Sequence, residues 1–136
     1  MRISRLDLLR YGRFSDLSLS FPSKTPDLHI VFGPNEAGKS TTLSAIENLL
    51  FGIPSNSTLN FLHDHAALRI GALLEREGER LEVRRRKGNK ETLLTREDLP
   101  MVTGESFLAP YLAGADLTFF TRMFSLESSR LRQGGN

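Results

Sequence analysis

The sequence predicts an α/β fold, because three consecutive stretches follow the order strand, turn, helix. Residues 28–32 (LHIVF) form a short, mostly apolar run, typical of a strand in the middle of a sheet covered on both faces. Residues 33–40 (GPNEAGKS) form a glycine-rich turn. Beyond it, apolar residues recur at spacings of three and four and predict a helix ending near Gly52: Leu43, Ile46, Leu49 and Leu50.

The remaining elements indicate a mixed sheet with a helical tail. Residues 2–9 and 17–21 have apolar positions suited to two strands, and YGRFSD between them predicts the turn of a hairpin. Residues 66–96 contain three short strand-like segments separated by EGE and GN, which predict an antiparallel meander attached to a different kind of sheet. Residues 104–132 have helical spacing and carry aromatic side chains expected in a core or an interface: Phe107, Tyr111, Phe119, Phe120 and Phe124.

Composition places the chain among ordinary globular domains. Its 136 residues, with 39% hydrophobic and 25% charged, suit one domain with one core. The sequence lacks both an apolar run of membrane-spanning length and a signal peptide, so we expect a cytoplasmic protein with no membrane partner. The absence of cysteine excludes disulfides and thiolate metal sites, and three histidines are too few for a convincing metal cluster.

The turn at 33–40 matches the pattern G-x-x-x-x-G-K-[ST], in which each fixed position has a physical reason. The glycines let backbone N–H groups curl around a phosphate, the lysine reaches the terminal phosphates, and the serine hydroxyl ligates Mg²⁺. We therefore predict an ATP and Mg²⁺ site in which Ser40 is the metal ligand and the side chain of Glu36 points outward. The predicted binding residues are Gly33, Pro34, Asn35, Glu36, Ala37, Gly38, Lys39, Ser40 and Thr41.

The loop and the hairpin before it resemble a known family. GPNEAGKST, preceded by a hairpin with YGRF, resembles the ATP-binding heads of the SMC and SbcC-type ATPases, an ABC-class group that works on chromosomes and DNA ends. Within that group, IENLLFGIP, FLHDHAALRIG, LEVRRRKG and MFSLESSRLRQGG are most similar to the YhaN-like AAA proteins. The resemblance implies that residues 1–136 form a P-loop NTPase half-domain, the N-terminal lobe of a head that is ABC/SMC-head-like.

The resemblance also implies a second lobe, which carries the Walker B acid pair and the signature loop. An apolar strand ending in Asp-Glu is absent from this sequence, and the nearest candidate, FSLE at 124–127, has one acid. We therefore expect this stretch alone to hydrolyse ATP weakly or not at all. In the full-length protein, the resemblance implies an ATPase acting in DNA repair or on chromosomes. Its implied partners are the C-terminal half of its own head beyond a coiled coil, a second head in a homodimer, DNA and a nuclease subunit.

Two further sites follow only from the resemblance. Residues of the first turn are implied to approach the base and α-phosphate, which makes Arg13 a candidate phosphate ligand, although relatives often carry the basic residue where this chain has Gly12. The alternative is an exposed hairpin arginine. The Mg²⁺-binding glutamine of the family falls near Glu127 by spacing or at Gln133 by residue type, and a third alternative is that neither residue is a ligand.

Two charged segments have open interpretations. Alternation along residues 79–90 puts Leu81, Val83 and Arg85 on one face of a strand and leaves Arg84 and Arg86 on the other. The basic strand at 84–87 either contacts DNA phosphates or is a solvated edge protected by its charges. His63, Asp64 and His65 are either metal ligands or, as we expect, a packed or capping segment.

Two functional alternatives to the ATPase are a non-hydrolysing nucleotide-binding or scaffold module that recruits a partner protein, and a small-molecule kinase. The kinase needs its own acceptor site and lid, for which the arginine-rich meander is poorly suited.

Overall fold

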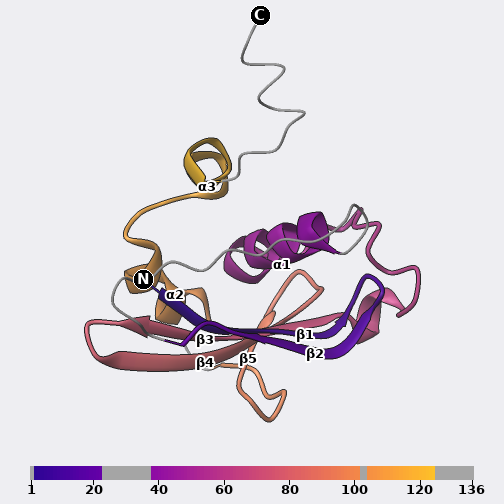
Figure 1. Cartoon of the computed structure of the whole chain (residues 1–136), viewed down its shortest axis with the longest axis horizontal. Coiled ribbons are helices and arrows are strands. Elements are labelled where there is room, and N and C mark those ends of the chain that lie inside the picture. Colours follow the sequence, from indigo (N-terminus) through magenta and orange to yellow (C-terminus); the bar gives the residue numbers. More distant parts are fainter. Residues whose placement is uncertain (1, 23–37, 102–103, 125–136) are drawn as a thin grey trace, which may run out of the picture.

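An antiparallel sheet with helices on one side is the centre of the structure (Figure 1). The computed structural model describes residues 2–22, 38–101 and 104–124. In these residues the strand order is β2-β1-β3-β4-β5. The strands are β1 (Arg2–Tyr11), β2 (Phe14–Ser20), β3 (Arg69–Arg76), β4 (Glu79–Arg86) and β5 (Leu93–Leu94). The strand predicted at residues 28–32, which would make the sheet mixed, lies outside the described residues.

The predicted N-terminal hairpin is confirmed, with longer strands than the pattern indicated. Tyr11 pairs directly with Phe14, so the turn between β1 and β2 consists of Gly12 and Arg13 alone. Gly12 has a φ of 58°, in the left-handed region that glycine adopts at little cost. The predicted turn over YGRFSD was too long because aromatic side chains at both ends of it favour the extended pairing.

Strand β1 contains two irregularities that change which side of the sheet its residues face. Its register against β3 shifts between Ile3 and Arg5 and again between Leu8 and Arg10. Across the second shift, Leu8 lies opposite Ile70 whereas Arg10 lies opposite Arg69. The shift therefore places Arg10 on the opposite side of the sheet from Leu8, as expected for a β-bulge.

The three strands predicted between residues 66 and 96 are present, whereas the sheet of a different kind to which we expect them to be attached would include residues 28–32, outside the described residues. Strand β3 pairs with β1 from Arg2↔Glu75 to Arg10↔Arg69, so the meander continues the sheet begun by the hairpin. Glu77 and Gly78, both with positive φ, form the turn between β3 and β4. β5 follows β4 as a two-residue edge strand.

The helices are α1 (Lys39–Phe51), α2 (Glu105–Leu112) and α3 (Leu117–Phe124), with a short 3₁₀ helix η1 (His65–Ala67) before β3. The predicted start and end of α1 are confirmed, and Gly52 after it has a φ of 106° and donates to the Asn48 carbonyl at 2.9 Å. The predicted helical stretch at 104–132 corresponds to α2 and α3, and its last residues, 125–132, lie outside the described part.

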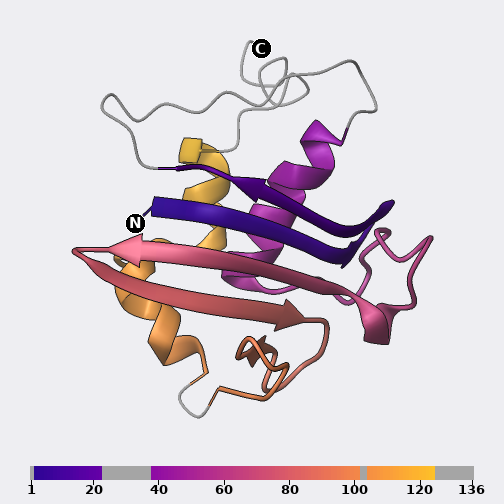
Figure 2. The same ribbon diagram turned by 60° about the horizontal axis from the view of Figure 1, so that its bottom comes forward.

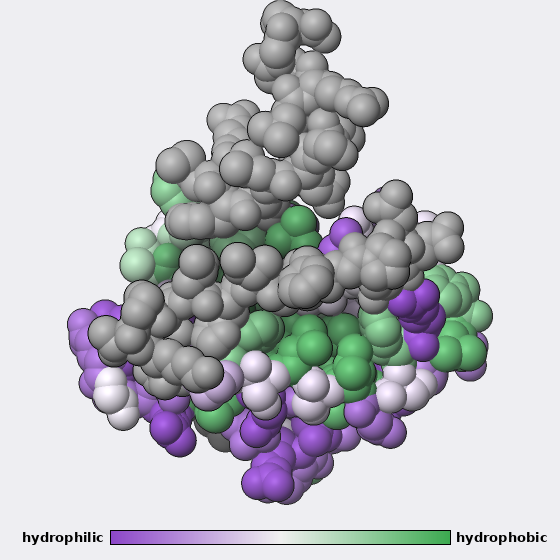
Figure 3. Space-filling model, viewed as in Figure 1, coloured by the Kyte–Doolittle hydropathy of each residue, from purple (hydrophilic) through white to green (hydrophobic). Residues whose placement is uncertain are grey.

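The two sides of the sheet differ in chemistry. The inner side faces α1 and holds the core, which includes Leu6, Leu8, Ile70 and Val83 together with Leu49 and Leu50 of α1. Turning the molecule brings the outer side forward, with the helices behind it (Figure 2). In the space-filling view, hydrophilic residues gather along the lower edge of the molecule, where the outer side of the sheet lies (Figure 3). Among the described residues, no helix has the length and hydropathy that a membrane crossing requires.

The aromatic residues of the helical tail divide between core and surface. Tyr111 of α2 is buried, and Phe120 of α3 packs on Phe51 of α1 with ring centroids 5.6 Å apart. Phe107 and Phe119 are about half exposed, at 48% each. The prediction of a core or interface role therefore fits Tyr111 and Phe120 directly.

Candidate phosphate-binding site at the start of helix α1

Gly38 forms the junction between the predicted phosphate loop and α1. Its φ is 97°, and its carbonyl accepts both the backbone N–H of Thr42 at 2.9 Å and the Oγ1 hydroxyl of Thr42 at 2.8 Å. The helix therefore begins immediately after this glycine, at Lys39. At this end of the helix the first N–H groups have no intrahelical partner.

The first turn of α1 suits a negatively charged ligand. Lys39 and Ser40 are exposed, the turn contains no acidic residue, and no side chain of the described residues caps it by a hydrogen bond. The positive end of the helix dipole and the first N–H groups are thus not neutralised by a carboxylate of that turn. This is the arrangement in which helix N-termini bind phosphate groups.

The turn between β1 and β2 packs against this junction. A Cβ atom built on Gly38 would clash with Cζ of Phe14, so the phenylalanine ring occupies the space that any larger residue would need. A Cβ built on Gly12 would lie 3.2 Å from Cγ2 of Thr41. The structure therefore brings the first hairpin turn and the start of α1 together, in the region where the sequence predicts the nucleotide.

Arg13 lies at the tip of that turn and is exposed. Its guanidinium carbon is 5.2 Å from the centroid of the Phe14 ring, a cation–π contact that holds the side chain near the helix start. The guanidinium therefore lies close to the junction and remains accessible to a ligand.

A loop after α1 is fastened to the same turn. The Gly12 N–H donates to the carbonyl of Leu59 at 3.0 Å, and Nε2 of His63 lies 3.0 Å from Oγ of Ser15 and 3.2 Å from the carbonyl of Phe14. The second histidine of the HDH motif, His65, contacts the Ser57 carbonyl at 3.1 Å through Nε2. Both histidines hold the loop in place, so the packed-segment interpretation of this motif is confirmed.

Tyr11 connects the sheet to the middle of α1. It is fully buried on the inner side, and its hydroxyl oxygen accepts a hydrogen bond from Nδ2 of Asn48 at 2.5 Å. Burial raises the pKa of the Tyr11 hydroxyl above its usual value, the charge of Glu47 raises it further, and the hydrogen bond from Asn48 partly offsets this. The phenol is thus kept neutral beneath the helix that carries Lys39.

The C-terminal end of α1 contacts Arg85, a residue whose burial the sequence interpretation did not predict. Arg85 of β4 is 1% exposed, and it donates to the carbonyls of Leu49 at 3.0 Å and Leu50 at 3.2 Å in the last turn of α1. It also donates to Oγ1 of Thr92 at 2.9 Å and forms an ion pair with Glu105 of α2. A DNA contact by Arg85 is therefore excluded.

Seven candidate site residues fall outside the part of the chain that the structure describes: Gly33, Pro34, Asn35, Glu36, Ala37, Glu127 and Gln133. The five remaining candidates lie in two places: Arg13 in the turn between β1 and β2, and Gly38, Lys39, Ser40 and Thr41 at the start of α1. The packing of Phe14 on Gly38 was not anticipated, because contacts between residues this far apart leave no periodic signal in the sequence.

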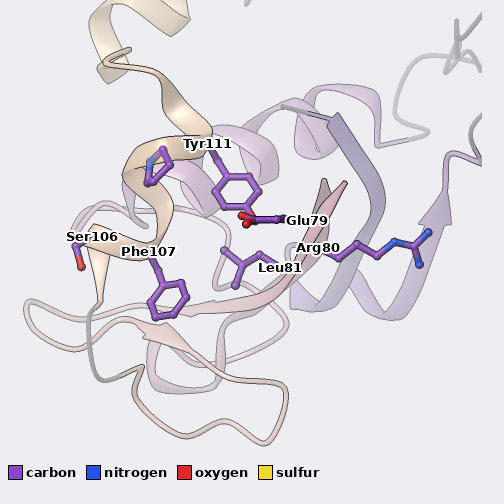
Figure 4. A pocket seen from close by; sticks show the side chains of 7 residues that line it. Glu79, Arg80, Leu81, Ser106, Phe107 and Tyr111 are labelled. Carbon is purple, nitrogen blue, oxygen red and sulfur yellow. The ribbon is translucent and has the colours of Figure 1, made fainter. Parts of the chain in front are cut away.

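A hollow with a volume of about 560 Å³ lies elsewhere, between β4 and α2 (Figure 4). Phe107 and Tyr111 of α2 face Leu81 across it, while the side chain of Arg80 points away. Its predominantly apolar lining is unsuited to a triphosphate.

Comparison with known proteins identifies similar sequences. The family model described as AAA domain matches residues 1–136, the whole chain. This chain belongs to the AAA domain family. It is also 30% identical, over 136 residues, to the uncharacterized protein YhaN of Bacillus subtilis (strain 168). That alignment covers 98% of this chain and 14% of the relative, so the AAA domain described here spans a small part of that protein's length.

Proposed function

We propose that this AAA domain binds Mg·ATP at the start of α1. The observation that carries the proposal is the junction after the glycine-rich motif, where a left-handed Gly38 precedes exposed Lys39 and Ser40 and the first helical turn holds no acid. Family membership supports a nucleotide ligand, because the match covers the motif and its helix. A bare helix N-terminus alone attracts anions weakly, whereas the lysine adds a full charge directed at the terminal phosphates.

Each described residue has a distinct role in this proposal. Lys39 supplies an ammonium group to the terminal phosphates, and Ser40 supplies a hydroxyl to the metal ion. We assign Thr41 and Arg13 to the α-phosphate side of the ligand, and the position of Thr41 beside the β1–β2 turn supports this assignment. When bound, Mg²⁺ neutralises charge on the phosphate oxygens. Phe14 orients the junction by packing on Gly38.

Hydrolysis is a separate proposal that concerns the longer protein. In-line attack by water needs a residue that orients it, and the first turn of α1 contains no carboxylate. We therefore propose that residues 1–136 alone bind nucleotide with little turnover. In the longer protein, a C-terminal lobe and a second head would complete the site and give an ATPase that dimerises on ATP. A role in DNA repair, with DNA and a nuclease subunit as partners, belongs to the same proposal.

Calorimetric titration with ATP in the presence of Mg²⁺ tests the binding site. We expect Lys39→Ala to weaken ATP binding by about 10- to 100-fold, the cost of losing a charge-assisted contact. Lys90→Ala is the matched control, because Lys90 is an exposed lysine in the loop between β4 and β5. Equal affinities for Lys39→Ala and the unmodified chain would remove the proposed site.

The role of Ser40 is tested by varying Mg²⁺ in the same titration. We expect Ser40→Ala to reduce the gain in affinity that Mg²⁺ provides, while affinity measured without Mg²⁺ changes little. If Ser40→Ala instead weakened binding equally with and without Mg²⁺, its hydroxyl would contact phosphate and the metal assignment would be wrong.

A further inference from the structure

Four arginines lie together on the outer side of the sheet, and three of them are aligned across neighbouring strands. Arg10 of β1 lies directly opposite Arg69 of β3, and Arg69 lies directly opposite Arg86 of β4. Arg84, two residues before Arg86, is on the same side of β4. Like charges directly opposite one another on neighbouring strands destabilise a sheet. We call these four residues, Arg10, Arg69, Arg84 and Arg86, the arginine row.

Backbone carbonyls fix most of these guanidinium groups in place. Arg10 donates from Nε to the carbonyl of Ala67 at 2.7 Å, and Arg69 donates from Nη1 to the carbonyls of Ala66 at 3.1 Å and Leu68 at 2.8 Å. The Arg86 guanidinium donates to three carbonyls of the loop that follows β4, at residues 87, 90 and 91. Carbonyl oxygens orient a guanidinium but carry no compensating charge, so the row is rigid and remains strongly positive.

Counter-charge near the row is small. In the described residues, the carboxylate paired with it is that of Asp98, with Oδ1 3.2 Å from Nη1 of Arg84 and 3.7 Å from Nε of Arg69. Arginines near the other end of the outer side are better matched. Arg5 pairs with Asp7 at 3.0 Å and with Glu82 at 2.6 Å. The excess of positive charge is therefore local to the row.

Arg69 in the middle of the row is the least well satisfied of the four. Its side chain is 17% exposed, and its Nε is buried with no hydrogen-bond partner in the described residues. Burial lowers the pKa of Arg69, Asp98 partly offsets this, and the charges of Arg10, Arg86 and Arg84 lower it further. An external anion beside the row would relieve the repulsion among these charges.

We propose that the arginine row binds the phosphate groups of a ligand, at a site separate from the start of α1 and on the other side of the sheet. Guanidinium groups bind phosphate oxygens in a bidentate manner, and neighbouring strands place successive groups about 4.8 Å apart. The site is on the outer side, which the helices leave uncovered (Figure 2), so an extended chain of phosphates can lie across it. This inference does not depend on nucleotide binding at Lys39.

Fluorescence anisotropy at low ionic strength tests the site, with a labelled 20-nucleotide single strand as probe and tripolyphosphate as competitor. All measurements use the Lys39→Ala background, so that the proposed ATP site contributes little. We expect the combined Arg10→Gln and Arg86→Gln variant to bind the strand at least tenfold more weakly, because two charge-assisted contacts are lost. Arg80→Gln is the matched control, since Arg80 is 70% exposed at the far tip of β4.

A variant expected to strengthen binding distinguishes a loss of binding from misfolding. Asp98→Asn removes the carboxylate that competes for Arg69 and Arg84, so we expect it to tighten binding of the strand several-fold, which a folding defect would not do. Retained binding by the double arginine variant would overturn the proposal. The proposal would also be overturned if poly-glutamate, at the same concentration of charge, competed as effectively as tripolyphosphate. The row would then attract any polyanion. Complete displacement by tripolyphosphate at equal phosphate concentration identifies free phosphates as the ligand source, and weaker displacement identifies a nucleic-acid backbone.

Discussion

The two ends of helix α1 differ in how the charge of the helix dipole is compensated. At the C-terminal end, the buried guanidinium of Arg85 donates to the carbonyls of Leu49 and Leu50, so a positive charge of the protein itself satisfies the negative end. At the N-terminal end, the first turn after Gly38 contains no acidic residue, and Lys39 adds positive charge. One end is therefore completed by the fold, and we propose that the other is completed by a ligand.

This difference separates stability from function along one helix. Residues at the buried end are expected to determine the free energy of unfolding, whereas exposed residues at the open end are expected to determine nucleotide affinity. Two results would contradict this comparison. One is a substitution at the exposed end that strongly destabilises the fold, and the other is a substitution at the buried end that leaves its stability unchanged.

The largest expected effect is at Arg85. We expect Arg85→Ala to lower the free energy of unfolding by about 3 kcal/mol, because it leaves buried helix carbonyls without donors and opens a cavity. Arg84→Ala, one residue earlier and on the outer side of the same strand, should cost about 1 kcal/mol or less, as is usual for a partly exposed ion pair. Urea denaturation measures both, and equal losses for the two variants would contradict the assignment.

The glycines at the two ends of α1 provide the next test. Gly38 and Gly52 have similar positive φ values, 97° and 106°, but a Cβ on Gly38 meets the Phe14 ring whereas a Cβ on Gly52 meets nothing within 4 Å. Their ψ values differ, because Gly38 (ψ 16°) is in the left-handed helical region whereas Gly52 (ψ 151°) is in a region that essentially only glycine adopts. We expect Gly52→Ala to cost about 1 to 3 kcal/mol from backbone strain alone, and Gly38→Ala about 2 kcal/mol from milder strain together with the contact to the ring. In a Phe14→Ala background, the cost of Gly38→Ala should fall by about 1 kcal/mol and that of Gly52→Ala should stay the same. An unchanged cost of Gly38→Ala in that background would mean that the ring does not contribute.

A pH titration tests the contact between the sheet and the middle of α1. The pKa of Tyr11 is raised in the folded state, so the native protein holds this proton more tightly than the unfolded chain. The associated stability is fully present below the unfolded pKa of about 10 and is lost as pH rises above it. We expect the unmodified chain to lose about 1 kcal/mol more than Tyr11→Phe between pH 10 and 11. Parallel pH profiles for the two proteins would show that Tyr11 is not buried in this way.

The smallest expected effect is at the exposed end. Lys39→Ala, which we expect to impair ATP binding, should change the free energy of unfolding by no more than about 0.5 kcal/mol when no nucleotide is present. Adding Mg·ATP should then raise the midpoint of thermal unfolding for the unmodified chain and much less for the variant, because a ligand stabilises the state that binds it. A large stability loss in Lys39→Ala without nucleotide would make the residue structural.

Local patterns predicted much of the fold. Apolar spacing and the glycines at positions 38 and 52 placed both ends of α1, and alternation placed the strands of the meander. The alternation also put Arg85 on the same face as Leu81 and Val83, both of which are half-buried or buried. The position of Arg85 in the alternation therefore indicated that it is buried. Arginine is usually exposed, however, and the interpretation of this strand as a charged surface followed that general preference.

The rest depended on contacts between distant residues. The pairing of β1 with β3 joins the hairpin and the meander into one sheet, and no short-range pattern encodes which strands become neighbours. The contact of Phe14 with Gly38 and the alignment of Arg10 with Arg69 follow from that pairing. The arginine row was invisible in the sequence for the same reason, since its members come from three strands.

The register shift after Leu8 determines which side of the sheet Arg10 and Tyr11 face. In an unbroken strand, Arg10 would point towards α1 and Tyr11 towards the outside. The single additional residue, Leu9, exchanges them, so that the phenol meets Asn48 and the guanidinium joins Arg69. Pairing Leu9 itself with Arg69 would thus send a charge beneath the helix and a ring into the charged surface, whereas deleting Leu9 would leave Arg10 and Tyr11 on their present sides.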